Sequence, residues 1–228
     1  MRPISRGATP SVFTRYREAA DPLMERLGSY CSYCERYIET HLAVEHIQPK
    51  DTNPNLALAW DNFLLACVNC NSCKGDSPID INQYLWPDTY NTLRAFSYRQ
   101  ALVDVNPQIS AANQPLALAL LKLVGLDKDP GNPAIDRRPT DADRRWRTRQ
   151  DIWDLATLSK RDLEEADTPQ MRAQIVRTAR ARGGFAIWFT VFCDDQDMLK
   201  RLAGEFPGTA AECFDIHGIA IPRPGGRV

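Results

Sequence analysis

Two cysteine pairs restrict the fold of this chain more than any other feature. They are Cys31-Ser-Tyr-Cys34 and Cys67-Val-Asn-Cys70, separated by residues 35 to 66. A CxxC turn lets two thiolates converge on one ion, at about 2.3 Å for zinc, and two such turns complete a tetrahedral site. We therefore expect a structural zinc site, because four thiolates leave no position for a reacting water. The alternative is that one pair is a redox dithiol or simply buried.

The remaining cysteines favour metal binding over disulfides. Five of the seven cysteines lie within residues 31–73, and the sequence begins without the apolar segment of a secretory signal. Cys73 repeats the CxxC interval and can replace a cysteine of the second pair, but we expect it to be a bystander. We expect Cys193 and Cys213 to be small, buried hydrophobic residues.

Composition and apolar patterning predict a soluble, cytoplasmic protein. The chain is 43% hydrophobic and 25% charged, which is ordinary for a globular protein. Its longest apolar stretches, PLALALLKLVGL and FAIWFTVFC, fall short of the roughly 18 residues that a membrane span needs. No membrane association is therefore expected.

Polar residues around the second cysteine pair form another pattern. Glu45 and His46 lie side by side in VEHIQPK, Asn62 precedes the apolar run FLLAC, and Asn71 follows Cys70 in a Cys-Asn-x-x-Lys-Gly turn. Taken singly, each has a structural interpretation, such as a hydrogen-bonded histidine, a solvated glutamate, a turn asparagine or a helix N-cap. Their joint order is much less expected by chance.

The stretches YCSYCER, VEHIQPK and NFLLACVNCNSCKGD resemble the HNH endonuclease family over roughly residues 29–77. The resemblance implies a β-hairpin and a helix that together hold a divalent ion, Mg²⁺ or Mn²⁺. His46 matches the general base, and an ordinary imidazole pKa near 6.5 suits that role at neutral pH. Glu45 and Asn71 match the two metal ligands, and oxygen ligands are those that Mg²⁺ prefers.

Three further residues are assigned from the same motif. Asn62 matches the middle asparagine of the family, which braces the loop that holds the histidine. Lys50 and Lys74 are candidate contacts to a substrate phosphate. The alternative for each lysine is an exposed, solvated charge.

A wider resemblance extends over most of the chain. With YLWPDTYNT included, the motif region is similar to Septu-type antiphage nucleases and to HNH proteins associated with retrons. GFAIWFTVF, FPGTAAECFD and RPGG are similar to the C-terminal part of HNH proteins encoded beside ATPases. This resemblance implies an ABC-like, SMC-related ATPase partner and degradation of DNA during phage infection. Some relatives cut RNA instead, including tRNA.

The charge distribution is unlike that of a stand-alone nucleic-acid binder. Residues 1–28 carry five arginines and three acidic residues, residues 29–100 carry five basic and eight acidic residues, and residues 101–228 carry eighteen of each. Affinity for DNA depends on neutralising phosphates with Lys and Arg. Either a partner supplies the basic surface, or two local arginine clusters do, unless these are solvated faces balanced by nearby acids. The clusters are Arg137, Arg138, Arg144, Arg145, Arg147 and Arg149, and Arg172, Arg177, Arg180 and Arg182.

We expect an α+β fold in which a small zinc-stapled ββα-metal core is embedded in a mostly α-helical protein. Residues 1–28 form an N-terminal helical segment that could bind a partner, residues 29–100 the nuclease domain, and residues 101–228 a mainly helical region. Within that region, Pro115 and Gly125 bracket one helix, and Thr168-Pro169 and Gly183 bracket another. Thr140 and Asp143 suggest a capping box that opens a long helix through residue 160.

Two other functions compete with the nuclease. The first is a non-catalytic Cys₄ zinc module that binds protein or nucleic acid, with Glu45 and His46 in structural roles. The second is a redox protein that uses its CxxC pairs. The sequence leaves substrate preference, trigger and partner stoichiometry open.

Overall fold

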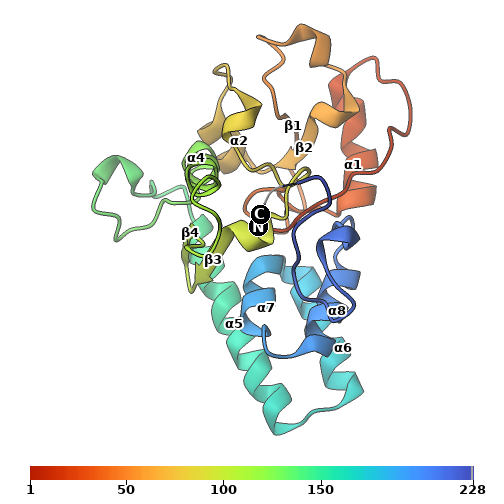
Figure 1. Ribbon diagram of the computed structural model, residues 1–228, viewed down its shortest axis with the longest axis vertical. Coiled ribbons are helices and arrows are strands. Elements are labelled where there is room, and N and C mark those ends of the chain that lie inside the picture. Colours follow the sequence, from red (N-terminus) through yellow and green to blue (C-terminus); the bar gives the residue numbers. More distant parts are fainter. Residues whose placement is uncertain (227) are drawn as a thin grey trace.

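A two-stranded antiparallel sheet followed by a short helix forms the centre of the upper half of the molecule (Figure 1). The computed structural model describes residues 1–226 and 228. Strand β1 (Ala43–His46) pairs with β2 (Phe63–Ala66) in a register that places His46 opposite Phe63. Helix α2 (Val68–Lys74) begins directly after β2 and ends at Gly75, whose φ is +64°. The expected ββα arrangement is confirmed.

The ββα unit is too small to bury its own apolar surface, and neighbouring elements cover it. All four residues of β2 are buried. A 3₁₀ turn (Tyr16–Ala19) leads into α1 (Ala20–Leu27), which turns Leu23 and Leu27 into the core and packs against β2. Figure 1 shows α1 beside this sheet. The N-terminal segment is thus part of the hydrophobic core rather than a separate arm.

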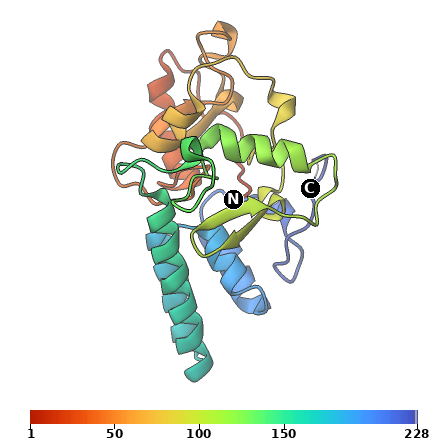
Figure 2. The ribbon, with the colours of Figure 1, turned by 90° about the vertical axis from the view of Figure 1, so that its left-hand side faces the viewer.

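A second hairpin and a helix lie below the ββα unit. Helix α3 (Thr92–Ala95) leads into β3 (Phe96–Arg99), which pairs with β4 (Leu102–Val105). Helix α4 (Gln114–Val124) ends at Gly125 in the left-handed conformation, as expected, and packs against α2 (Figure 2). The β3–β4 hairpin crosses the boundary suggested after residue 100, so the division into three regions stays a prediction.

Four helices complete the lower half of the molecule. They are α5 (Arg145–Glu165), α6 (Pro169–Arg182), α7 (Phe185–Val191) and α8 (Gln196–Glu205). Figure 2 shows α5 as the longest helix, extending away from the ββα unit. The side chain of Thr168 caps α6 and that of Asp195 caps α8, because each accepts a backbone N–H of the first turn.

The lower helices are joined to the first cysteine pair through Glu35. Its carbonyl accepts a hydrogen bond from Gly184 N at 2.9 Å, and its Oε2 accepts one from Ala186 N at 3.0 Å in the first turn of α7. A Cβ on Gly183 would lie 2.4 Å from the same carbonyl oxygen. Only glycine fits there, so the α6–α7 junction packs directly on the backbone that follows Cys34.

The structure corrects three expectations. The long helix begins at Arg145 rather than near Thr140, because the Asp143 side chain is bonded to Arg145 instead of closing a capping box. Cys193 is exposed, whereas Cys213 is buried as expected. The mixture of aromatic and turn residues in 81–98 predicts irregular structure, but this segment contains a 3₁₀ turn (Ile81–Gln83), α3 and most of β3. Among the helices of the described residues, none has the length and apolar character to cross a membrane.

Candidate active site and metal centre

The four cysteines of the two CxxC pairs converge in the folded chain. Their Sγ atoms all lie within 4.8 Å of one another, all four side chains are buried, and Cys34 Sγ lies 3.6 Å from Cys67 Sγ. A tetrahedral zinc with bonds of about 2.3 Å separates its sulfur ligands by about 3.8 Å. The geometry therefore fits one zinc ion. Cys73 is not in this group, which is the one cluster of three or more potential ligands among residues 1–226 and 228.

The thiols are electrostatically coupled. Burial raises the pKa of Cys31 and Cys70 well above the ordinary value, whereas hydrogen bonds from the neighbouring cysteines lower that of Cys67. Four buried thiolates in contact would repel strongly in the absence of a cation. Binding of a metal ion therefore releases protons and contributes to folding.

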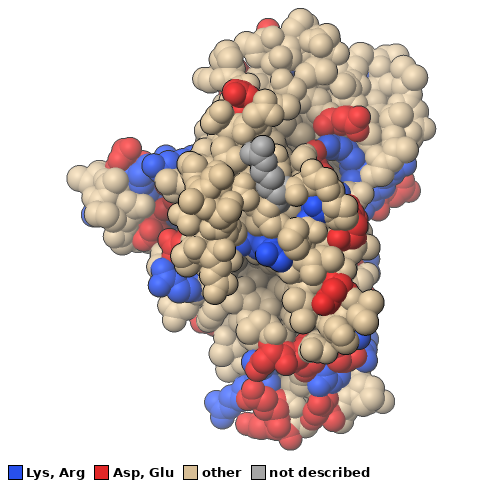
Figure 3. Space-filling view, in the orientation of Figure 1, with Lys and Arg blue, Asp and Glu red and all other residues tan. Residues whose placement is uncertain are grey.

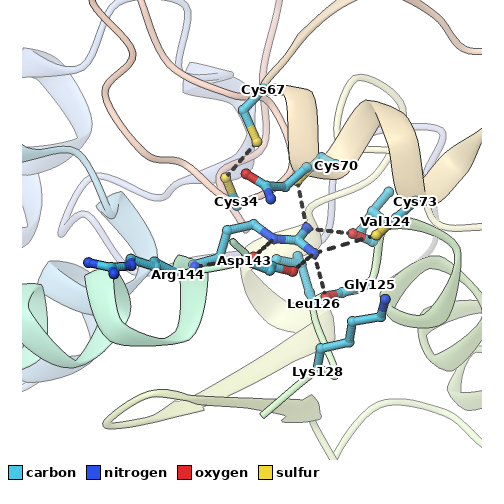
Figure 4. Close-up of polar contacts among 12 residues, drawn as sticks. Cys34, Cys67, Cys70, Cys73, Val124, Gly125, Leu126, Lys128, Asp143 and Arg144 are labelled. Atoms are coloured by element: carbon cyan, nitrogen blue, oxygen red, sulfur yellow. Dashed lines mark hydrogen bonds and ion pairs between the residues drawn. The ribbon is translucent and has the colours of Figure 1, made fainter. Parts of the chain in front are cut away.

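Arg145 closes the cysteine cluster from the side of α5. Its guanidinium donates to Cys70 Sγ at 3.1 Å, to Val124 O at 2.6 Å and to Gly125 O at 3.0 Å. It also forms two hydrogen bonds to the Asp143 carboxylate. Figure 4 shows Cys70, Cys73, Val124, Gly125 and Asp143 gathered around these contacts. Arg145 is only 2% exposed, and its guanidinium is fully hydrogen-bonded. Its position beside the cysteine cluster is therefore fixed.

A second arginine approaches the other side of the cluster. The thiolate charges of Cys34 and Cys67 raise the pKa of Arg36, although burial opposes this. Its guanidinium donates to Asn69 Oδ1 at 3.2 Å. The two arginines place positive charge next to a centre that carries a net charge of −2 when four thiolates bind Zn²⁺.

His46 occupies the end of β1 and is held in one orientation. Its Nε2 lies 3.0 Å from the carbonyl oxygen of Ala57. Because a carbonyl can only accept, Nε2 carries the proton and Nδ1 is left as the acceptor. The ring packs edge-on against Tyr16 and Phe63, with centroid distances of 5.0 and 5.2 Å. Burial lowers the pKa of His46, so the imidazole is neutral at neutral pH and able to take a proton.

Glu45 and Lys74 form a buried ion pair beside the histidine. Lys74 Nζ lies 3.0 Å from Glu45 Oε1 and donates to the carbonyl of His46 at 2.8 Å, and the hydroxyl of Tyr33 donates to Glu45 Oε1 at 3.2 Å. Burial raises the pKa of Glu45, and the charge of Lys74 offsets only part of this rise. Lys74 is 5% exposed, so it is not a surface lysine, but it lines the cavity described below, and its ammonium group keeps a third N–H donor besides those used for Glu45 and His46.

Asn62 lies where a brace for the His46 loop is expected. Its Oδ1 accepts from Gln48 N at 2.8 Å, and its Nδ2 donates to Gln48 O at 2.9 Å and to Leu56 O at 3.2 Å. The side chain is 4% exposed and does not line the cavity described below. The amide thus ties the chain after β1 to the loop before β2.

A cavity of about 140 Å³ brings the proposed metal ligands together. Glu45, His46, Lys50 and Asn71 all line it, in agreement with the motif. Asn71 is exposed within α2 and is therefore not the helix N-cap, a position taken by Cys67. A carboxylate and an amide oxygen in a small polar cavity fit a hard divalent cation. The roles of these residues in metal or substrate binding stay predictions.

Two other polar side chains line the same cavity and were not singled out from the sequence. Tyr16 comes from the 3₁₀ turn before α1, and Asp76 follows α2. Tyr16 lies outside the motif, and no local pattern marks it. Asp76 could have been noted as a carboxylate close to the Lys-Gly turn, where another oxygen ligand can reach the cavity.

Acidic residues neutralise part of the two arginine clusters. Arg137 pairs with Asp127, Arg172 with three aspartates, and Arg180 with Glu205, while Arg149 is buried along with Arg145. On the face shown in Figure 3, basic and acidic side chains are intermingled at the lower tip of the molecule. The clusters are therefore only partly balanced, since Arg138, Arg144 and Arg147 are exposed and form no ion pair within the described residues.

Comparison with known proteins agrees with the geometry. The HNH endonuclease family model matches residues 31–77. The Septu protein PtuB of Bacillus thuringiensis is 43% identical over 56 residues, which are 23% of this chain and 22% of that protein. The match thus spans about a fifth of the length of that relative. Residues 31–77 carry an HNH endonuclease domain, and the resemblance seen in the sequence is confirmed for this region.

Proposed function

We propose that this protein is an endonuclease that hydrolyses phosphodiester bonds of DNA at the cavity lined by Glu45, His46 and Asn71. The observation that carries the proposal is the fixed orientation of His46, whose Nε2 is held by the Ala57 carbonyl at 3.0 Å. This contact leaves Nδ1 free to accept a proton. The HNH domain match over residues 31–77 supports the same chemistry.

His46 acts as the general base. Its imidazole takes a proton from the attacking water at Nδ1, and burial keeps the ring neutral until that step. Tyr16 and Phe63 hold the ring from two sides, so it loses little freedom during the reaction. Asn62 acts indirectly by fixing the loop after β1.

Glu45 and Asn71 are the ligands of the catalytic cation. A bound Mg²⁺ or Mn²⁺ supplies positive charge to the phosphate and to the leaving 3′ oxygen. Lys74 neutralises Glu45 through an ion pair of 3.0 Å when the carboxylate has no other partner. Lys50, 41% exposed at the cavity, is the better placed of the two lysines to meet a phosphate oxygen.

The four cysteines hold a structural zinc ion. Their mutual proximity and burial support this role, and four thiolates leave no open coordination position. The zinc centre links the turn before β1 to the start of α2, because one cysteine pair comes from each. It thereby supports the relative position of the two elements that line the cavity.

The biological setting we infer is antiphage defence in the cytoplasm, together with an ABC-like or SMC-related ATPase. The support is the sequence resemblance and the similarity to the Septu protein PtuB. The overall balance of 28 basic and 29 acidic residues also favours a partner that supplies a basic surface, since DNA affinity depends on phosphate neutralisation. The alternative substrate is RNA, including tRNA.

The deciding experiment is an Mg²⁺-dependent cleavage assay with plasmid, linear DNA and tRNA, with and without the ATPase encoded beside the protein. His46→Ala is expected to reduce cleavage by about 10²- to 10⁴-fold, the usual contribution of a general base. Zinc content should not change, and the chain should stay folded with a melting temperature lowered by the lost packing of the ring on Tyr16 and Phe63. His217→Ala, which removes an exposed histidine, is the matched control. Full activity of His46→Ala would refute the assignment, and a protein that binds but never cuts would favour the non-catalytic zinc module.

A further inference from the structure

A groove adjoins the His46 cavity on the far side of Tyr16. It has a volume of about 600 Å³ and is lined by residues 14–18 on one side and by Ala57 and Leu58 on the other. Tyr16 lines both the groove and the cavity of about 140 Å³. The Ala57 carbonyl that holds His46 belongs to the opposite wall. The groove therefore continues directly from the candidate active site.

The walls of this groove combine an aromatic ring, apolar carbon and free cationic charge. Tyr16 is half-buried, its ring is fixed against His46, and Leu58 is 43% exposed. Arg17 is exposed and forms no ion pair with any carboxylate in the described part of the chain, and its Nε donates to the Tyr16 hydroxyl at 3.3 Å. Arg15, by contrast, is paired with Glu18 at 3.1 Å. Uncompensated positive charge is thus concentrated at Arg17.

This combination matches the chemistry of one nucleoside with its phosphate. A base stacks on an aromatic face, which contributes about 1–3 kcal/mol per base in single-strand binding proteins, and the phosphate pairs with a cationic side chain. The volume lies within the range of roughly 300–1,000 Å³ that is usual for small ligand sites.

We infer that the groove binds the nucleoside that flanks the scissile phosphate, with Tyr16 and Arg17 as substrate-positioning residues. The inference rests on the proposed nuclease function, because it assumes that the cleaved strand passes over His46. It assigns substrate binding to the segment before α1, outside residues 31–77 that carry the HNH domain. The 3₁₀ turn of Tyr16–Ala19 then forms a wall of the active site and also positions the nucleic-acid strand.

The test measures binding separately from cleavage. Oligonucleotides of single-stranded DNA, duplex DNA and RNA are titrated by fluorescence anisotropy against the full wild-type chain without added Mg²⁺ or Mn²⁺, a condition that stops the proposed cleavage and keeps the contact between His46 and Tyr16. Tyr16→Ala is expected to weaken binding by about 5- to 100-fold, as for loss of one stacked base. Arg17→Gln is expected to lower affinity and to reduce the slope of log K against log salt by about one, as for loss of one phosphate contact.

Two further variants guard against simple loss of folding. Tyr16→Phe keeps the ring and should bind within about twofold of the parent. Leu58→Glu changes only an exposed wall residue but introduces a negative charge, and should weaken binding with an unchanged melting temperature. Arg161→Gln, which removes an exposed arginine on α5, is the charge-matched control and should bind normally.

The outcomes separate this inference from the proposed function. If the wild type cuts and neither Tyr16→Ala nor Leu58→Glu changes KM or binding, the groove does not bind substrate, and the proposed nuclease function is retained. If binding depends on Tyr16 and Leu58 but no cleavage occurs, the groove binds nucleic acid, but the nuclease function and the position beside a scissile phosphate are both wrong. If the chain neither binds nor cuts any of the three nucleic acids, both are wrong.

Discussion

The guanidinium of Arg145 lies 3.1 Å from the sulfur of Cys70, although 75 residues separate them in the sequence. This contact joins the first turn of α5 to the cysteine cluster of the HNH domain. A donor to a metal-bound thiolate withdraws charge from the sulfur and lowers its tendency to be protonated or oxidised. The helical region is therefore chemically connected to the metal centre as well as packed against it.

Replacing Arg145 should weaken zinc retention. Arg145→Met removes the donor to Cys70 and leaves Asp143 buried without its partner, which costs about 3–5 kcal/mol. We expect faster zinc loss to a chelator and a lower melting temperature. The double variant Asp143→Asn/Arg145→Met should recover much of the stability but not the zinc retention. If the double variant keeps zinc as firmly as wild type, Arg145 acts only through Asp143. Arg161→Met is the control on the same helix.

The pair of Asp143 and Arg145 also predicts a pH dependence of stability. Burial alone would raise the pKa of Asp143, but the hydrogen bonds and charge of Arg145 outweigh it and lower the pKa below the ordinary value. Unfolded chains therefore take up a proton at higher pH than the folded protein does. The stabilisation is fully present above about pH 4 and is lost as pH falls through the lower, folded-state pKa.

Urea unfolding at several pH values checks this prediction. Asp143→Asn should be less stable than wild type at pH 7, and the difference should shrink as the pH falls below about 4. A difference that is constant across this range would contradict an ionised, lowered-pKa carboxylate. The zinc content of each sample must be measured, because acid also protonates the thiolates.

Lys74 should control the affinity of the cavity for the catalytic cation. It neutralises Glu45 at 3.0 Å, so Lys74→Met leaves a buried carboxylate that keeps the hydrogen bond from Tyr33 but has no positive charge beside it until a cation binds. We expect a lower melting temperature without divalent ions and a larger rise on addition of Mg²⁺ than in wild type. Lys50→Met, which changes a half-exposed lysine of the same cavity, is the control. Equal shifts in all three proteins would mean that Glu45 is not a ligand.

Asn62 should affect catalysis through the position of the loop. Asn62→Ala removes three hydrogen bonds. The backbone N–H and carbonyl of Gln48 and the carbonyl of Leu56 then lose their partner. A buried unsatisfied group costs about 1–3 kcal/mol. We expect a lower melting temperature and a lower kcat, with little change in Mg²⁺ affinity. A loss of Mg²⁺ affinity with unchanged stability would instead make Asn62 a ligand.

Cys73 should be dispensable for the metal centre. Its sulfur lies outside the four-cysteine group and 3.6 Å from the Arg145 guanidinium. Cys73→Ser should retain one zinc per chain, whereas Cys70→Ser should lose it and unfold the region. Zinc analysis of the purified proteins and circular dichroism distinguish the two cases. If Cys70→Ser retained one zinc per chain and Cys73→Ser retained none, Cys73 rather than Cys70 would be the zinc ligand.

Local sequence patterns predicted the residues of the HNH motif. Most of the site residues that they missed reach the site through contacts between distant parts of the chain. The CxxC turns, the Glu45-His46 pair and the Asn71 turn each lie within a few residues of sequence, so spacing alone indicates which atoms can converge. Tyr16 and Arg145 reach the site only because α1 and α5 pack on the ββα unit. No sequence pattern around Tyr16 or Arg145 indicates that the residue lies at the site.

Two errors have a clear physical origin. The helix start near Thr140 was wrong because the Asp143 carboxylate accepts from the guanidinium and the backbone N–H of Arg145 rather than from the backbone N–H of Thr140, and charged hydrogen bonds are stronger than a neutral cap. The expectation for Cys193 relied on the usual burial of free cysteines, yet it follows the end of α7 and its side chain is exposed. Helix capping and burial both depend on what the rest of the chain offers.

The hydrogen bond between Glu35 and the first turn of α7 can form only after the residues between them have been synthesised. Its two partners are separated by 151 residues, and ribosomes add roughly 5–20 residues per second, so the N-terminal cysteine turn waits roughly 8–30 seconds for the helix that covers it. During synthesis the nascent metal-binding segment must remain reduced and unaggregated without that cover. Zinc supplied early in translation is therefore expected to raise the yield of folded protein more than zinc added after release.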